Sequence, residues 1–302
     1  MENYRIVNSS DMAVVVHHTR YVMIRAIDTH VHFWELAGYR GFDGWFAGRE
    51  YLRRDYLPHH LRPKLAGIGA EGAVIVGAAP DSHRHNLEWG AMCEQHADVL
   101  GLVGSYSMSS PRLSEWLDDY AGKPWFVGIR SQPALPPERW GEDAAADRGA
   151  RELLRRGLAL DILVQHHLIP AVGEFARRHP DLPFVLNHCG LPPFRDGGLD
   201  VWERHVRELA ALPNVVVKYS SFFLHCHPGC EADELRRAAG VLFEAFGSER
   251  LLWGSNWPPE LVGGSYREAF DTMMDSAPAL SEDERRRVLR DNAIRVYKLP
   301  IK

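Results

Sequence analysis

Residues 27–34 read Ile-Asp-Thr-His-Val-His-Phe-Trp, and this stretch decides both the fold and the place of the site. The apolar and β-branched residues of 24–31 predict a short buried strand. Side chains two positions apart on a strand point to the same face, so we expect His30 and His32 side by side. An isolated pair of this kind is weak evidence, but α/β barrels carry catalytic groups at the carboxyl ends of their strands.

Seven further runs rich in β-branched and aromatic residues follow, separated by segments with helical spacing. The eight predicted strands are 24–31, 73–77, 100–106, 125–130, 158–165, 184–188, 215–220 and 250–256. Helices are predicted over 150–156, 170–178, 202–211, 233–246 and 281–296, the last with Ser281 as its N-cap. Strands that alternate with helices pair in parallel through right-handed crossovers. Eight such units in 302 residues predict a single-domain α/β protein, a (β/α)8 TIM barrel.

The chain divides into two parts. Residues 1–23 show no clear period and predict an N-terminal extension, and residues 24–302 hold the barrel. The segment Gly67–Gly72 matches the dinucleotide-binding pattern G-x-G-x-x-G. It precedes a predicted strand, however, whereas a phosphate site needs its glycines after one. We interpret it as a helix-to-strand turn.

Composition excludes several classes of function. The chain is 45% hydrophobic and 25% charged, which is typical of a globular domain, and its net charge of -5 offers no basic surface to nucleic acid. No apolar run approaches the roughly 20 residues that a membrane span needs, so no membrane partner is expected. Four cysteines do not form a disulfide framework in a chain of this length, and a reducing cytoplasm is the expected location. A homodimer is compatible with the sequence.

Histidines gather at the predicted carboxyl ends of strands. Nine of the 16 lie there: His30, His32, His83, His85, His166, His167, His188, His225 and His227. Convergent imidazoles serve metal binding, proton transfer or hydrogen bonding to an oxyanion. For His83, His85 and His166, exposed loop positions are an equally good interpretation. A zinc site at residues 225–230 has the wrong cysteine spacing, and a loop that lines the pocket is favoured there.

Five residues besides His30 and His32 are individual candidates for the site. His188 closes the predicted sixth strand, unless it is a hydrogen-bonded core histidine. Arg130 ends the fourth strand and suits bidentate binding of a carboxylate, with a structural ion pair as the competing explanation. Lys218 lies inside the seventh strand, where an ammonium needs a carboxylate partner or a substrate anion. Trp34 and Trp257 are candidate pocket walls, although either could be core packing.

The ordered motifs over 24–299 resemble those of the amidohydrolase superfamily. The resemblance is to the branch of fuconolactonase, rhamnonolactonase and 2-pyrone-4,6-dicarboxylate lactonase. Besides residues 27–34, its motifs are YLP at 56–58, GIR at 128–130, DILV at 161–164, NHCG at 187–190, VKYS at 217–220, WGSNWP at 253–258 and DNA at 291–293.

The resemblance implies a hydrolase that opens a lactone of a sugar acid or a dicarboxylate, hence a small anionic substrate. It implies that His30, His32 and His188 polarise the lactone carbonyl, directly or as ligands of a metal. Branches of the family differ in their need for metal, so none or one divalent metal is expected, and Zn²⁺ if one is bound. The implied substrate-binding residues are Arg130, Lys218, Trp34, His166 and Trp257.

Position 256 departs from the family pattern. Relatives end the eighth strand with Gly-Ser-Asp-Trp-Pro, in which the aspartate activates water, whereas this chain has Asn256. An amide can position water but accepts no proton at neutral pH, and loss of a general base typically costs about 10²–10⁴ in rate. Asn187, where relatives often have aspartate, is a second departure, and the parity that turns His188 inward predicts that it points outward.

Three hypotheses follow. The first and favoured one is a hydrolase of a small, polar, carboxylated lactone or related ester, in which Asn256 positions water and His32, His166, His225 or a substrate group is the base. The second is a non-hydrolytic enzyme of the same fold, a decarboxylase, lyase, cyclase or isomerase, that acts on a small organic acid. The third is a barrel that binds a small acid without converting it, because a fold alone does not fix function.

Overall fold

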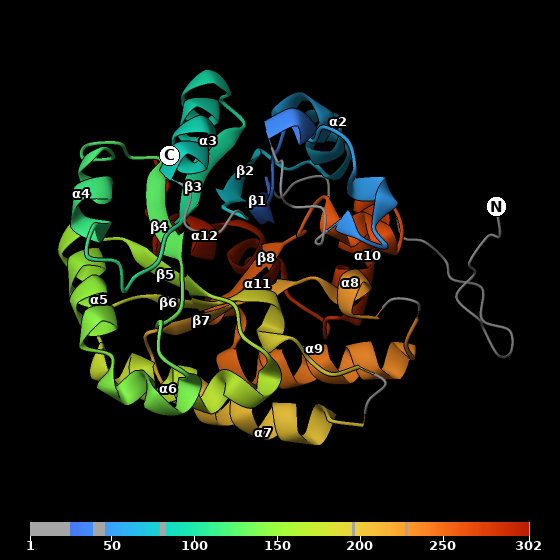
Figure 1. The fold of residues 1–302 in the computed structure, drawn as a ribbon. Coiled ribbons are helices and arrows are strands. Elements are labelled where there is room, and N and C mark those ends of the chain that lie inside the picture. The colour runs from blue at the N-terminus through green and yellow to red at the C-terminus, as the bar shows by residue number, and fades with distance from the viewer. Residues whose placement is uncertain (1–24, 39–45, 79–82, 195–196, 227–228, 302) are drawn as a thin grey trace, which may run out of the picture.

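The structure is a computed structural model that describes residues 25–38, 46–78, 83–194, 197–226 and 229–301. The predicted extension over 1–23 and His227 lie outside these residues. Eight parallel strands form one sheet in chain order (Figure 1). They are β1 (Ile27–Val31), β2 (Gly72–Val76), β3 (Val99–Ser105), β4 (Phe126–Arg130), β5 (Ala159–Ile162), β6 (Phe184–Leu186), β7 (Val215–Ser220) and β8 (Leu251–Gly254).

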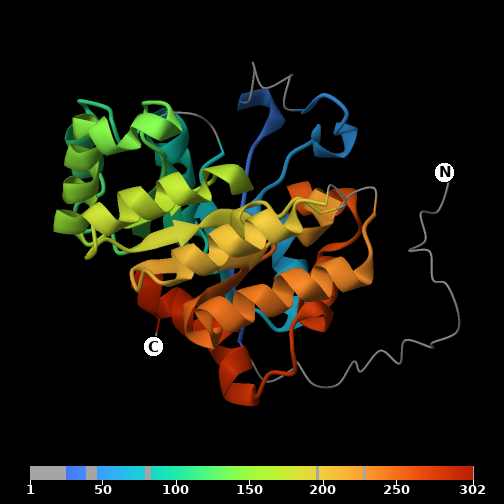
Figure 2. The same cartoon turned by 90° about the horizontal axis from the view of Figure 1, so that it is seen from below.

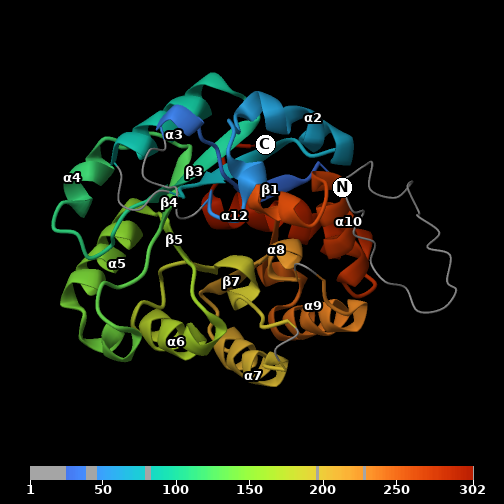
Figure 3. The same ribbon diagram turned by 45° about the vertical axis from the view of Figure 1, so that its right-hand side comes forward.

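Helices alternate with the strands and lie outside them in each of three views (Figures 1, 2 and 3). The longer ones are α2 (Pro58–Ile68), α3 (His83–Gln95), α4 (Leu113–Asp118), α5 (Ala144–Arg156), α6 (Ile169–Arg178), α7 (Leu199–Ala210), α9 (Ala232–Phe246) and α10 (Tyr266–Ser276). The short ones are η1 (Leu36–Gly38), η2 (Glu50–Leu52), η3 (Pro137–Glu142), η4 (His166–Leu168), η5 (Asn187–Gly190), α8 (Phe222–Cys226), η6 (Ser248–Arg250), η7 (Pro259–Val262), α11 (Glu282–Arg286), η8 (Arg287–Asp291) and α12 (Asn292–Tyr297).

The sheet closes on itself between its first and last strands. Backbone N–H of Asn256 donates to the carbonyl of His30 at 2.8 Å, and N–H of His32 donates to the carbonyl of Trp257 at 2.8 Å. These bonds form a seam just past the end of β8, and the parallel bridge between Val31 and Trp257 belongs to it. The predicted single-domain barrel is therefore confirmed, and the residues of the predicted site take part in its closure.

All eight predicted strands occur, and five of them end earlier than expected, those predicted over 73–77 and 100–106 by one residue each. The strand predicted over 158–165 ends at Ile162, that over 184–188 at Leu186, and that over 250–256 at Gly254. Ser281 caps the last helix as predicted, since its Oγ accepts from N–H of Glu284. The helix predicted as one piece over 281–296 is divided into α11, the π-helical η8 and α12.

The cysteines differ from the expectation at one place. Cys226, at the end of α8, forms a disulfide with Cys230 across four residues, whereas Cys93 and Cys189 are free thiols. The disulfide also removes both thiols of the zinc site considered at residues 225–230. Among the described residues, no helix combines the length and the apolar character that crossing a bilayer requires.

Candidate active site

Three imidazoles meet inside the carboxyl end of the barrel. The rings of His30 and His32 lie 4.9 Å apart between centroids, and those of His30 and His188 lie 4.3 Å apart. The exposed fraction of these side chains is 5% or less. The pairing of β1 with β2 shifts register between Asp28 and Val31, where His30 stands, and such irregularities often aim side chains at active sites. The structure thus brings together the histidines that the sequence placed on two separate strands.

His188 reaches the cluster by a route that differs from the prediction. It lies past the end of β6, in η5, with a φ of 52°, and Cys189 follows with a φ of 57°. Non-glycine residues rarely adopt this left-handed conformation, which costs roughly 1–3 kcal/mol at each position. The turn directs the His188 ring to His30, and its Nδ1 makes a 2.8 Å hydrogen bond with Ser220 Oγ. Strain of this kind concentrates at functional sites.

The prediction that the side chain of Asn187 points outward was wrong. Its side chain is fully buried, and its amide donates to Asp161 Oδ2 at 3.0 Å inside the barrel. Val185, two residues earlier, belongs to the apolar cluster that also holds Val216 of β7. Val185 and Asn187 are therefore the inward residues of this segment. His188 needs the η5 turn to reach the same interior.

Lys218 is paired with a carboxylate, which was one of the two partners that the sequence predicted for its ammonium. Its Nζ lies 2.6 Å from Asp161 Oδ2, and both side chains are fully buried. The hydroxyl of Tyr297 donates to the other carboxylate oxygen at 2.8 Å. The same Nζ lies 3.4 Å from His30 Nδ1. Asp161 was part of a family motif in the sequence but was not among the predicted site residues.

This contact fixes the proton of the neighbouring imidazole. An ammonium only donates hydrogen bonds, so His30 Nδ1 must accept from Lys218. Burial, and after it the charge of Lys218, lower the pKa of His30 well below its ordinary value, so the ring is neutral. A neutral ring that accepts at Nδ1 carries its proton at Nε2. His30 Nε2 is buried without a hydrogen-bond partner, which leaves a donor inside the cluster.

The other two imidazoles are neutral as well. Burial lowers the pKa of His32 to about 3, with Arg130 as the second cause, and burial also lowers the pKa of His188 well below the ordinary value. Arg130, half-buried at the end of β4, lowers the pKa of all three rings and lies within electrostatic reach of each. The cations of the site are therefore Arg130 and Lys218, and the carboxylate of Asp161 balances the charge of Lys218.

Asn256 stands beside the cluster, directly after β8, with a φ of 58° that asparagine tolerates better than most residues. Its Oδ1 lies 3.2 Å from His32 Nε2, and its Nδ2 donates to Ser221 Oγ at 2.8 Å. His32 Nδ1 donates to the carbonyl of Val76 at 2.7 Å, which leaves a lone pair on Nε2 of the neutral ring. The amide oxygen and this lone pair are two adjacent acceptors, either of which can bind a hydrogen of a water molecule.

Sequence reasoning missed two polar residues behind Asn256. Ser221, at the end of β7, has a φ of 70°, and its hydroxyl donates to Glu260 Oε2 at 3.2 Å. Glu260 is 4% exposed, and burial raises the pKa of its carboxyl to about 8. Its only signal in the sequence is an acid directly after Trp257-Pro258-Pro259, and no spacing rule connects that acid to the histidines.

The two predicted pocket walls pack on the same ring. Trp34 and Trp257 each make an edge-to-face contact with Tyr56, with centroids 5.1 Å apart in both pairs. The indole of Trp34 donates to the carbonyl of Arg54 at 2.9 Å. The indole N–H of Trp257 is buried without an acceptor.

Several other predicted histidines lie in helices at the barrel rim. His83 begins α3, where its ring pairs with the hydroxyl of Tyr106 at 2.8 Å and with Asp119 at 2.9 Å. His166 lies in η4, with its ring edge-on to that of His167. His225 lies in α8, and its ring centroid is 6.1 Å from that of His188. Of these three, His225 has a described ring contact with the cluster.

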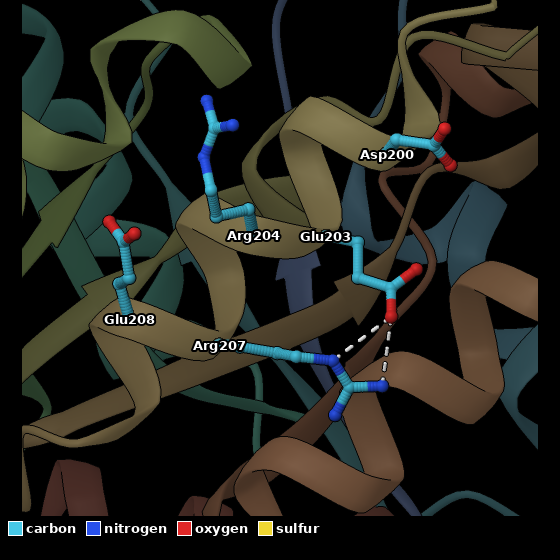
Figure 4. A pocket seen from close by; sticks show the side chains of 5 residues that line it. All are labelled: Asp200, Glu203, Arg204, Arg207 and Glu208. Atoms are coloured by element: carbon cyan, nitrogen blue, oxygen red, sulfur yellow. Dashed lines mark hydrogen bonds and ion pairs between the residues drawn. The ribbon is translucent and has the colours of Figure 1, made fainter.

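A surface hollow of about 420 Å³ lies elsewhere, on α7 (Figure 4). Its lining consists of charged side chains of that helix, Asp200, Glu203, Arg204, Arg207 and Glu208. Arg207 and Glu203 form an ion pair at 3.0 Å, with exposed fractions of 42% and 25%. Exposed pairs of this kind are ordinary on helix surfaces, so we assign the hollow no part in the site.

Comparison with known proteins places this geometry in a family. The family model described as Amidohydrolase matches residues 27–299. The chain belongs to the amidohydrolase family. Membership confirms the predicted superfamily and indicates a hydrolytic enzyme.

Two curated relatives and one solved structure are similar to this amidohydrolase over most of its length. The L-fucono-1,5-lactonase of Burkholderia ambifaria is 30% identical over 90% of this chain and 95% of its own. The L-fucono-1,5-lactonase of Burkholderia multivorans is 34% identical over 91% and 96%. A crystal structure of an amidohydrolase from Burkholderia multivorans with bound zinc superposes with a TM-score of 0.84 at 31% identity, over 91% of this chain and 99% of that one.

Proposed function

We propose that this amidohydrolase hydrolyses a small, polar, carboxylated lactone to the corresponding hydroxy acid. Two lactonases at 30% and 34% identity over nine-tenths of the chain support this class of substrate. One observation of the structure carries the proposal, the buried and unpaired Nε2–H of His30 between two other neutral imidazoles. A buried donor without an acceptor costs free energy, and the carbonyl oxygen of a bound lactone would satisfy it.

The chemistry follows from where charge develops. When water adds to the lactone carbonyl, its oxygen becomes an oxyanion, and the Nε2–H of His30 donates to it. Lys218, 3.4 Å behind that ring, and Arg130 provide positive charge that favours the oxyanion over the neutral carbonyl. Removal of one donor from such a hole typically lowers kcat by about 10²–10³. His188 lies against the His30 ring and supports its orientation.

The substrate anion belongs at Arg130. A guanidinium at the end of a barrel strand binds a carboxylate through two parallel hydrogen bonds. The three imidazoles are neutral and the ammonium of Lys218 is paired with Asp161, so we assign neither to the substrate anion. Asn256 holds the attacking water through its amide oxygen, next to the lone pair of His32.

The described residues do not fit the divalent metal that one relative contains. The expected ligands were His30, His32 and His188, yet a metal needs the lone pair of an imidazole nitrogen. At His30 Nε2 that lone pair is absent, because the ammonium of Lys218 holds the other nitrogen as an acceptor. No group of three or more His, Cys, Asp or Glu side chains arranged for a metal ion occurs in the described part of the chain. We therefore derive no step through a metal.

The test is turnover of a lactone panel by the purified protein, with its metal content measured on the same sample. L-fucono-1,5-lactone and carboxylated lactones are assayed by acid release. We expect hydrolysis, and a loss of about 10²–10³ in kcat for His30→Gln. His179→Gln is the matched control, because His179 pairs with Asp147 at the end of α6 and should leave kcat unchanged. Release of CO₂ from an organic acid without lactone turnover, or binding of an acid without any turnover, would contradict the proposal.

A further inference from the structure

A buried carboxyl group lies at the end of a hydrogen-bond chain that starts at Asn256, beside the imidazole cluster. Glu260 stands in η7, four residues after Asn256. It accepts from Ser221 Oγ at 3.2 Å and from N–H of Phe223 at 2.5 Å. Ser221 Oγ accepts from Asn256 Nδ2 at 2.8 Å, and Asn256 Oδ1 lies 3.2 Å from His32 Nε2. One hydroxyl and one amide thus link Glu260 to the site.

The proposed hydrolysis needs a base. Burial lowers the pKa of His32 to about 3, which makes its ring a weak one, and the nearby carboxylates differ in their freedom to act. Asn256 accepts no proton at neutral pH. Asp161 is neutralised by Lys218 at 2.6 Å. Asp28 accepts from N–H of Ser255 at 2.8 Å and from a tyrosine hydroxyl at 2.9 Å, and none of its described hydrogen bonds reaches Asn256. Glu260 is separated from Asn256 by a single side chain.

Ser221 has the properties of a proton relay. A hydroxyl is both donor and acceptor, so it can receive one proton while it gives up another. Its side chain is 1% exposed, which shields the relay from bulk solvent. Its φ of 70° is a conformation that glycine adopts without strain and serine does not. The hydroxyl is therefore held in place at a cost in backbone strain, and such strain is characteristic of functional positions.

We propose that Glu260, through Ser221, replaces the carboxylate that the family pattern has at position 256. This inference rests on the proposed lactone hydrolysis. The water donates one hydrogen to Asn256 Oδ1 and the other to the lone pair of Ser221 Oγ that the Asn256 amide leaves free. As the water oxygen bonds to the lactone carbonyl carbon, this second O–H bond breaks and its proton passes to Ser221 Oγ. The hydroxyl proton of Ser221 moves at the same time to Glu260 Oε2. When the tetrahedral intermediate collapses, the ring C–O bond breaks, and the proton returns along the same path to the leaving alkoxide.

The surroundings of Glu260 set the pH range of this step. Burial raises the pKa of its carboxyl to about 8, and the N–H groups of Phe223 and Leu224 and the Ser221 hydroxyl oppose that shift. Tyr51 from η2 and Cys189 from η5 are titratable groups that feel its charge. In α10, which also packs on η7, Glu268 is engaged with its own cap at Ser265. Hydrolysis should therefore increase as Glu260 ionises and level off at higher pH.

The first experiment compares pH profiles of kcat for lactone hydrolysis between pH 6 and 9. For the wild type we expect a rise that levels off near pH 8 to 9, after subtraction of spontaneous hydrolysis. Glu260→Gln keeps the size of the side chain and should lower kcat by about 10²–10⁴, with a flat profile. Ser221→Gly should lose a similar amount, and the double variant should lose no more, because both residues act in one chain. Glu268→Gln is the matched control and should retain the wild-type profile.

The second experiment separates a base from a structural role. In the Glu260→Gln background, Asn256→Asp places a carboxylate on the water, and we expect kcat to recover at least tenfold. The inference is overturned if Glu260→Gln folds and keeps the wild-type kcat and its rise with pH. It is also overturned if Glu260→Gln folds and is inactive but Asn256→Asp does not restore kcat in that background. If circular dichroism shows that Glu260→Gln does not fold, Ser221→Gly is tested instead. The inference is then overturned if Ser221→Gly keeps the wild-type kcat and pH rise, or if Asn256→Asp does not restore its lost kcat. Absence of lactone turnover in the wild type instead overturns the proposed function.

Discussion

Glu260→Gln should make the protein more stable relative to the wild type as the pH rises. Burial raises the pKa of Glu260 from its ordinary 4.5 to about 8 in the folded state. Between these two values the folded chain keeps a proton that the unfolded chain has released. The stability from that proton is fully present below pH 4.5 and is lost as the pH increases through about 8. At about 1.4 kcal/mol per unit, the wild type loses about 4 kcal/mol relative to the variant between pH 5 and pH 9.

The assay is urea denaturation of both proteins at pH 5, 6, 7, 8 and 9, with the difference in free energy of unfolding plotted against pH. Glu268→Gln supplies the control, because the cap of α10 lowers the pKa of Glu268 below 4.5. Its difference from the wild type should therefore be flat over this range. A difference for Glu260→Gln that is also flat would refute the argument, because Glu260 would then be ionised at pH 5 in the folded protein.

Three further outcomes are expected. Lys218→Met should lower the free energy of unfolding, measured by urea denaturation, by about 3–5 kcal/mol, because Asp161 would be left as a buried charge without its cation. A decrease below about 1 kcal/mol would contradict the buried pair. Arg130→Gln should raise KM for carboxylated lactones several-fold more than for neutral ones, and equal effects would remove its assigned role. Asn256→Asp should raise kcat at pH 6 at least tenfold, since a carboxylate at this position takes the proton of the water directly, whereas Glu260 with a pKa of about 8 is still protonated at pH 6, and an unchanged rate would count against a missing base.

The barrel could be predicted from the sequence because buried parallel strands leave a strong pattern. Strands covered on both faces are nearly continuous runs of apolar residues, and the run at Val215–Ser220 was located to the residue. The position of His30 and His32 followed from their spacing of two residues together with the rule that barrels carry catalytic groups at the carboxyl ends of strands. The ends of five strands were placed too late. At β6, for example, His188 and Cys189 already take left-handed conformations before the glycine of the turn, Gly190, is reached.

The sequence predicted those features of the site that depend on a single strand, but not the contacts between residues of different strands. The cost of burying an ammonium predicted a partner for Lys218, but Asp161 lies two strands away in the sheet, and only the closed barrel brings them together. The predicted outward orientation of Asn187 was wrong because we had assigned the inward face of the sixth strand from His188. Glu260 lies in a 3-10 turn with neither helical nor strand period, so no pattern connected it to Asn256.

The seam between β1 and β8 has a consequence for the making of the protein. The backbone bonds of His30 with Asn256 and of His32 with Trp257 join residues more than 220 positions apart in the chain. A nascent chain that stops before residue 251 has two open strand edges, apolar and ready to pair with another molecule. Synthesis of β8 and residues 255–257 therefore removes an aggregation hazard and assembles the site in one event, so a fragment that stops before residue 251 should have no activity.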